Sequence, residues 1–148
     1  MTKIALIVGS VYGGAQYVAE QAEPLLASLG YEVALYEEAN LDTVLGFEPD
    51  IWLVISSTTG QGDIPDNVFP FFSEVKNRFP LLTGKRFAVI ALGDSSYETF
   101  CSAGEQFREL LLDIQGLELA PMLRIDASET LEPETIALPW LTEQFKTR

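Results

Sequence analysis

Three glycine-rich polar segments follow the three most apolar runs of the sequence, and their residue types could bind a ligand. The first, residues 9–16, reads GSVYGGAQ and leads into a segment of helical period. Its glycines allow positive φ, so backbone N–H groups and a helix N-terminus can converge on one anion. Its spacing is that of a P-loop, but Ala15 and Gln16 replace the Lys and Ser or Thr that handle triphosphates. We therefore expect a monophosphate site with neutral donors such as Ser10, although an ordinary strand-to-helix turn has the same features.

The second and third polar segments offer donors suited to a different chemical group. Residues 56–63 read SSTTGQGD, and residues 93–101 read GDSSYETFC. Hydroxyls and flexible peptides of this kind could bind the carbonyl and ring-nitrogen edges of a planar heteroaromatic, on which Tyr97 could stack. Each segment alone also fits a polar surface turn, but the three together favour a mononucleotide-like ligand. We expect Cys101 to be a buried packing residue, because the chain has no His and no nearby cation to lower the pKa of the thiol.

The elements that must position these segments alternate between apolar runs and segments of helical period. We predict strands at residues 4–8, 32–36, 51–56, 87–92 and 122–125. We predict helices at residues 15–29, 40–49, 65–79, 101–114 and 136–145. This alternation is typical of an α/β fold, a three-layer sandwich with a five-stranded parallel sheet and helices on both faces. Ligands of such sheets bind at the carboxyl ends of the strands, where the three polar segments fall.

Some details of the helices can also be predicted. For the third helix, Asp63 or Asp66 is a possible N-cap, and the residues expected to face the sheet are Val68, Phe72, Val75 and Phe79. Pro24 and Pro139 lie inside predicted helices, where each removes a backbone hydrogen bond.

Composition limits the function further. The chain of 148 residues fits one domain, residues 1–148, without a membrane span. Because residues 1–3 lead directly into the first strand, we expect no signal peptide and a cytoplasmic location. The absence of His and the single Cys exclude catalytic triads, ordinary zinc sites and disulfides, so a cofactor would have to supply redox chemistry. A net charge of −13 argues against nucleic acid and membrane partners and favours basic proteins.

With these segments in place, the sequence resembles the flavodoxins, and more closely the short-chain flavodoxins of the MioC and YqcA type, over residues 3–145. The matching motifs are SVYGGA at residues 10–15, STTGQGDIPD at 57–66 and LGDSSYETFC at 92–101, the last being the most specific. The resemblance implies the flavodoxin-like strand order 2-1-3-4-5, bound FMN, and a low-potential one-electron carrier that is not itself an enzyme.

The resemblance also implies which residues bind FMN. The phosphate would be bound by Ser10, Val11, Tyr12, Gly13, Gly14 and Ala15. One side of the ring system would be lined by Thr58, Thr59, Gly60, Gln61 and Gly62, with the Gly60 carbonyl near N5. The pyrimidine edge and the outer ring face would be bound by Gly93, Asp94, Ser95, Tyr97, Phe100 and Cys101. Tyr12 and Ala15 stand where many flavodoxins have hydroxyls, and Thr59 where many have Trp, so we expect weakened FMN binding.

The partners implied are basic redox proteins, a flavodoxin or ferredoxin reductase upstream and an acceptor downstream, with the chain acting as a monomer. Carboxylates near the site would lower the flavin potential by about 35 mV each at a distance of about 10 Å; they are Asp63, Asp66, Asp94 and Glu98. Two alternatives are an FMN-dependent reductase of small molecules and a flavin-free interaction module. A receiver domain of the same fold is disfavoured, because it needs carboxylates at the ends of the first and third strands, where this chain has Val8-Gly9 and Ser56-Ser57.

Overall fold

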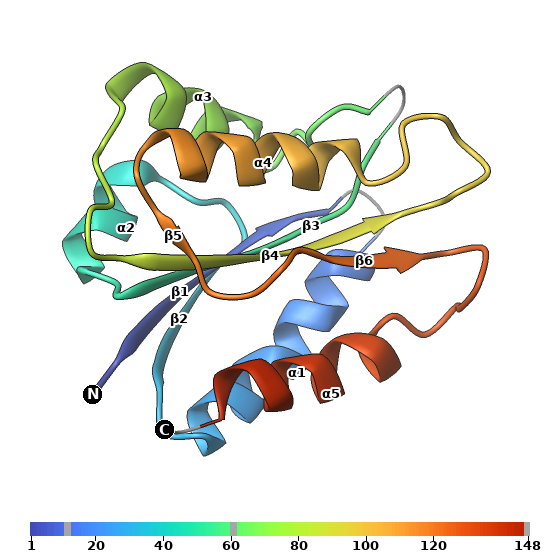
Figure 1. Ribbon diagram of the computed structural model, residues 1–148, viewed down its shortest axis with the longest axis horizontal. Helices are drawn as coiled ribbons and strands as arrows, with labels where there is room; N and C mark the ends of the chain where they lie inside the picture. Colours follow the sequence, from blue (N-terminus) through green and yellow to red (C-terminus); the bar gives the residue numbers. More distant parts are fainter. Residues whose placement is uncertain (11–12, 60–61, 147–148) are drawn as a thin grey trace.

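The computed structural model describes residues 1–10, 13–59 and 62–146, which are built around one parallel β-sheet (Figure 1). Its strands are β1 (Lys3–Gly9), β2 (Glu32–Tyr36), β3 (Ile51–Ser56), β4 (Arg86–Gly93), β5 (Leu117–Glu118) and β6 (Leu123–Asp126). The order β2-β1-β3-β4-β5 confirms the predicted order 2-1-3-4-5. The predicted strand at residues 122–125 corresponds to β6, and the two-residue strand β5 was not predicted. Both pair with β4, on either side of Pro121, which has no N–H to donate to the ladder.

The helices cover both faces of the sheet. They are α1 (Gly14–Ser28), α2 (Leu41–Phe47), α3 (Phe69–Arg78), α4 (Ser102–Asp113) and α5 (Glu134–Phe145). Figure 1 shows α1 and α5 on one face and α2, α3 and α4 on the other, which confirms the predicted three-layer α/β fold. Among the described residues, no helix combines the length and the apolar character needed to cross a membrane.

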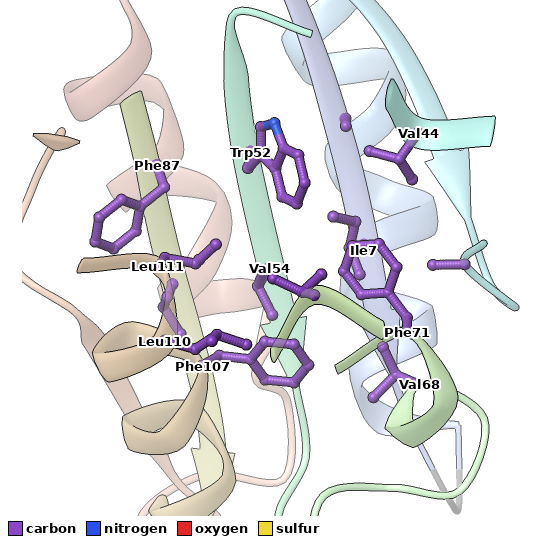
Figure 2. Packing of buried hydrophobic residues seen from close by; sticks show 14 of the residues in the cluster. Ile7, Val44, Trp52, Val54, Val68, Phe71, Phe87, Phe107, Leu110 and Leu111 are labelled. Atoms are coloured by element: carbon purple, nitrogen blue, oxygen red, sulfur yellow. The ribbon is translucent and has the colours of Figure 1, made fainter. Parts of the chain in front are cut away.

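The central strands β1, β3 and β4 are buried on both faces, as their continuous apolar runs predict. On one face, Trp52 of β3 packs against Phe71 of α3 with ring centroids 5.9 Å apart, and Phe87 of β4 joins the same cluster (Figure 2). On the other face, Leu26 of α1 and Phe145 of α5 are buried against the sheet. The alternate side chains of one strand therefore serve two separate apolar layers.

The predicted start of the third helix is wrong. Helix α3 begins at Phe69 with Val68 as N-cap, so neither Asp63 nor Asp66 caps it. The preceding residues instead form a turn in which the N–H groups of Val68 and Phe69 donate to the Pro65 carbonyl.

The buried face of α3 also differs from the prediction. Val68 and Val75 are buried, as predicted, and Phe72 is partly buried against the core. Phe71, which was not predicted, is buried, and Phe79 is 47% exposed. Phe79 has a φ of 49° and ends the helix, so its side chain no longer follows the helical period. Helices α1 and α4 each bury one apolar face, although Leu25 of α1 is only partly buried. Pro24 and Pro139 both lie within helices, as predicted, although α5 begins earlier than residue 136.

Gly104 of α4 packs directly against the sheet, and of the described glycines it leaves the least space for a side chain. A Cβ atom there would lie 2.4 Å from the Cβ atom of Ala91 in β4. We predict that Gly104→Ala lowers the free energy of unfolding by about 1–3 kcal/mol, because the helix must move off the strand. Gly46→Ala is the matched control, since Gly46 is an exposed helical glycine without a neighbour within 4 Å and alanine favours helix by about 0.5–1 kcal/mol. Urea unfolding measures both, and equal stability of Gly104→Ala and wild type would contradict the prediction.

Candidate functional site

The carboxyl ends of four parallel strands meet at one edge of the sheet. Gly9 pairs with Ser56, and Ser56 pairs with Ala91, so β1 and β3 end at the same level and β4 extends two residues further, to Gly93. Gly93 pairs with Asp126, which places the end of β6 beside the end of β4. The segments that follow these strands surround a cavity of about 540 Å³, here called the strand-end cavity. Its size lies within the range of small-molecule sites.

The structure brings residues of all three predicted loops together around this cavity. The predicted residues that line it are Gly14, Thr58, Thr59, Gly93, Asp94, Tyr97 and Phe100. Other predicted residues lie in the same loops without lining it: Ser10, Gly13, Ala15, Gly62, Ser95 and Cys101. Val11, Tyr12, Gly60 and Gln61 lie outside the described residues. One cavity therefore reaches from the start of α1 to the loops after β3 and β4.

The start of α1 has the properties of an anion site. Its N-cap, Gly13, has a φ of 86°, a conformation that glycine adopts without strain. The Gly13 N–H donates to the Ser10 hydroxyl at 3.0 Å. No side chain of the described residues caps α1, and its first turn contains no carboxylate. The first-turn N–H groups and the positive end of the helix dipole therefore remain available to an anion near Gly14.

The loop after β3 is held against α4. The N–H groups of Thr59 and Asp63 donate to each other's carbonyls, at 3.0 and 2.7 Å, which closes a tight turn. The Gln106 side chain of α4 donates to the Gly62 carbonyl at 2.9 Å. Gly62 has a φ of 95°, and a Cβ atom there would lie 3.0–3.1 Å from Ser102 and Thr99. A larger residue at Gly62 would be strained and would push this loop away from α4.

Cys101 lies behind the loop after β4 and does not line the cavity. It is fully buried, and its thiol donates to the Ala91 carbonyl at 3.5 Å. Burial raises the pKa of the Cys101 thiol to about 11, so the thiolate is scarce at neutral pH. A Cβ atom on Gly93 would lie 2.7 Å from the Cys101 backbone nitrogen. Cys101 is therefore a packing residue, as expected, and Gly93 lets the two ends of the loop approach closely.

A fourth segment, which the sequence reasoning did not assign to the site, also lines the cavity. It follows β6 and contributes Ala127, Thr130, Leu131 and Pro133. The side chain of Leu131 is 94% exposed and that of Tyr97 is 64% exposed, so the cavity has an apolar rim. The signal that could have found this segment is its position, since it follows a strand at the same carboxyl edge.

Asp126, the last residue of β6, connects this fourth segment to the loop after β4. Its Oδ1 atom accepts hydrogen bonds from the Ser95 N–H at 3.0 Å, from the Ser128 N–H at 3.0 Å and from the Ser128 hydroxyl at 2.8 Å. The two serine hydroxyls are also 3.0 Å apart. Hydrogen bonds from Ser95, and then from Ser128, hold the pKa of the Asp126 carboxyl well below its usual range. The Asp126 carboxylate thus fixes two loops of the cavity relative to each other.

The chain is similar to known proteins over nearly its whole length. The family model described as flavodoxin matches residues 6–140. Flavodoxin YqcA of Escherichia coli K12 is 43% identical over 147 residues, which cover 99% of this chain and 98% of that protein. Protein MioC of the same strain is 37% identical over 141 residues, which cover 95% of each. The solved structure of a C101A variant of a flavodoxin from Pseudomonas aeruginosa has a TM-score of 0.92 and 47% identity, and the match covers 96% of this chain and 95% of that one.

We predict that Asp126→Asn is less stable than wild type at pH 7, because the amide keeps an acceptor atom but loses the charge that strengthens three hydrogen bonds. A carboxyl group whose pKa is lower in the folded than in the unfolded chain stabilises the folded state at pH values above its ordinary pKa of about 4. This stabilisation is lost as the pH falls towards the pKa of the folded state. The difference in unfolding free energy should therefore stay constant from about pH 7 to 5 and narrow below about pH 4. Urea unfolding at several pH values measures it. Asp113→Asn, which removes an exposed carboxylate, is the control for the lost charge. A difference in unfolding free energy between Asp126→Asn and wild type that does not change with pH would contradict the prediction.

Proposed function

Because the chain belongs to the flavodoxin family, whose members are electron-carrying flavoproteins, we propose that it binds one FMN in the strand-end cavity. In this proposal the chain carries single electrons from a reductase to an acceptor protein and has no catalytic activity of its own. The observation that carries the proposal is the continuity of the cavity, which joins an uncapped helix N-terminus at Gly14 to the aromatic loop of Tyr97 and Phe100. These two ends suit the phosphate and the ring system of one mononucleotide.

The residues present fit FMN at the phosphate end. The loops contain no cation between residues 10 and 16, so neutral donors must bind the phosphate. The first-turn N–H groups of α1 and the Ser10 hydroxyl are such donors. Each hydrogen bond to a charged acceptor contributes about 1.5–3 kcal/mol to binding. Ala15 is buried and offers only its backbone. A dianionic phosphate would complete the helix start that no side chain caps.

The residues at the other end fit a flat ring. Leu92, Ile125 and Pro133 line the cavity together with Tyr97 and Phe100, so an isoalloxazine would be held largely by apolar contacts. When bound, FMN supplies one-electron chemistry. The chain excludes water from the inner part of the ring and sets the charge around it. Among the described residues, the aromatic side chains that line the cavity, Tyr97 and Phe100, both come from the loop after β4, and Thr59 lines it from the loop after β3. We therefore expect FMN to bind more weakly than it would between aromatic side chains on both ring faces.

The acidic residues of the strand-end loops support basic redox partners. The loops of residues 57–66, 94–101 and 127–133 contain six carboxylates and no Lys or Arg. The carboxylates are Asp63, Asp66, Asp94, Glu98, Glu129 and Glu132. Their field would disfavour further negative charge at the ring, which gives a low potential, and would steer a basic reductase or acceptor to the exposed rim. Monomeric action and a cytoplasmic location stay predictions.

We predict that the apoprotein binds FMN with a stoichiometry of one and prefers FMN to riboflavin, because only FMN carries the phosphate that the start of α1 would bind. FAD should bind more weakly than FMN, since its phosphate is esterified to an adenylate that the cavity would have to enclose. Fluorescence titration of the apoprotein with the three flavins measures the three dissociation constants. Equal affinity for riboflavin and FMN would remove the phosphate site from the proposal, and no binding of any flavin would contradict the proposal as a whole.

We also predict that Tyr97→Ala weakens the binding of both FMN and riboflavin by about threefold to tenfold, because loss of one stacked ring costs about 0.5–1.5 kcal/mol beyond burial. The substitution should also shift the first reduction potential of bound FMN. Leu117→Ala is the control, because Leu117 is 57% exposed in β5 and pairs with the amino end of β4, away from the cavity. Titration and spectroelectrochemistry measure both quantities. If Tyr97→Ala matches the control in affinity and in potential, Tyr97 does not contact the ring.

A further inference from the structure

The side chain of Asn67 holds the end of β1 at the point where the chain enters the loop before α1. Its Oδ1 atom accepts a hydrogen bond from the Ser10 N–H at 3.0 Å. Its Nδ2 atom donates to the Val8 carbonyl at 3.0 Å and to the Glu37 carbonyl at 2.7 Å. One side-chain amide thus uses both its acceptor and its donors on backbone groups from two different strand ends.

The pattern of these bonds is that of a parallel β-ladder. In such a ladder, a residue donates to the carbonyl before its partner and accepts from the N–H after it. The Asn67 amide does this with the Val8 carbonyl and the Ser10 N–H, on either side of Gly9. The pairing of β1 with β2 ends at Ile7 and Tyr36, so the Asn67 side chain extends the ladder after β2 has left the sheet.

Close packing keeps Asn67 in this position. A Cβ atom on Gly9 would lie 2.7 Å from Val68, 2.8 Å from the Ser56 hydroxyl and 3.4 Å from Pro65. The turn of residues 65–68 is therefore in contact with the backbone of Gly9, and two N–H groups donating to the Pro65 carbonyl close that turn. On the other side of β1, the Ser57 N–H donates to the Gly9 carbonyl at 2.8 Å. The end of β1 is therefore held from both sides.

We propose that Asn67 is the positioning residue of the phosphate loop, and that it gives the chain its preference for FMN over riboflavin. This inference rests on the proposed function and adds a residue outside the three expected FMN-binding loops to the phosphate site. Because the Ser10 N–H is bonded to Asn67, Ser10 can offer a phosphate only its hydroxyl, which now accepts from the Gly13 N–H. Asn67 thereby fixes the orientation of Ser10 and the distance from Ser10 to the start of α1.

The test compares flavin selectivity in two variants. Asn67→Ala removes all three hydrogen bonds, and Asn67→Asp keeps the shape and the acceptor but faces two carbonyls with a carboxylate and adds negative charge beneath the loop. We expect both variants to raise the dissociation constant for FMN by about tenfold or more, while that for riboflavin changes by less than about twofold. Asn40→Ala is the matched control, because the Asn40 side chain also accepts a backbone N–H, from Thr43 at the start of α2, but does not touch the loop.

Each other outcome is decisive. If the variants weaken the binding of FMN and of riboflavin equally, or weaken the binding of neither, Asn67 does not position the phosphate site and the inference is overturned. If wild type itself does not prefer FMN, the proposed phosphate site fails, which is visible without any variant, and the inference fails with it. Amide hydrogen exchange of Ser10 in the wild-type apoprotein provides a test that needs no variant to fold: the inference requires protection, and exchange at the rate of an unprotected amide would overturn it.

Discussion

The site depends on one constraint, which is that β1, β3 and β4 run parallel in a register that brings their carboxyl ends to one edge of the sheet. Their residues are paired so that Gly9, Ser56 and Ala91 lie side by side. Because these strands are buried on both faces, nearly every position along them must be apolar, and polar groups can appear only where the strands end. The same register that packs two apolar layers therefore gathers polar loops at one edge. The close approaches at Gly9, Gly93 and Gly104 are where this packing leaves no space for a side chain.

The sequence predicted the elements whose pattern is local and failed where tertiary contacts decide. Strand β3 was predicted to the residue, since six consecutive buried positions leave no doubt about its limits. The start of α3 was missed, because the packing of residues 65–68 on Gly9 holds them in a turn although Pro65 and Asp66 are good helix starters. Likewise, Phe79 fits the helical period in the sequence, but a left-handed residue ends the helix there. Strand β5, of two residues, is too short to give a periodic signal and was missed, whereas β6 was predicted to within one residue.

The site shows the same division. The three loops could be found because each combines glycines and hydroxyls directly after an apolar run. Asn67 and Asp126 could not be found in this way, since their hydrogen bonds join residues 57 and 31 positions apart. The segment of residues 127–133 has no motif of its own and was missed although it lines the cavity. Local composition thus indicates which loops can bind a ligand, whereas the residues that orient those loops depend on the tertiary fold.

The strand-end loops contain no Lys or Arg, and this absence explains why neutral side chains and one carboxylate must hold the site in shape. A cation attracts an anion over several ångströms and tolerates some misplacement, whereas an N–H group binds only within about 3 Å and near its own axis. A site of backbone donors must therefore be rigid before the ligand arrives, or its ordering would reduce the binding energy. Lys3 of β1 and Arg86 of β4 stand at the amino ends of these strands, away from the site. Arg124 of β6 lies at the level of Ala91 and forms an ion pair with Glu105 of α4 at 2.7 Å. The acidic edge remains free to attract a basic protein, and the side chains of Asn67 and Asp126 supply by hydrogen bonding the order that ion pairs would otherwise provide.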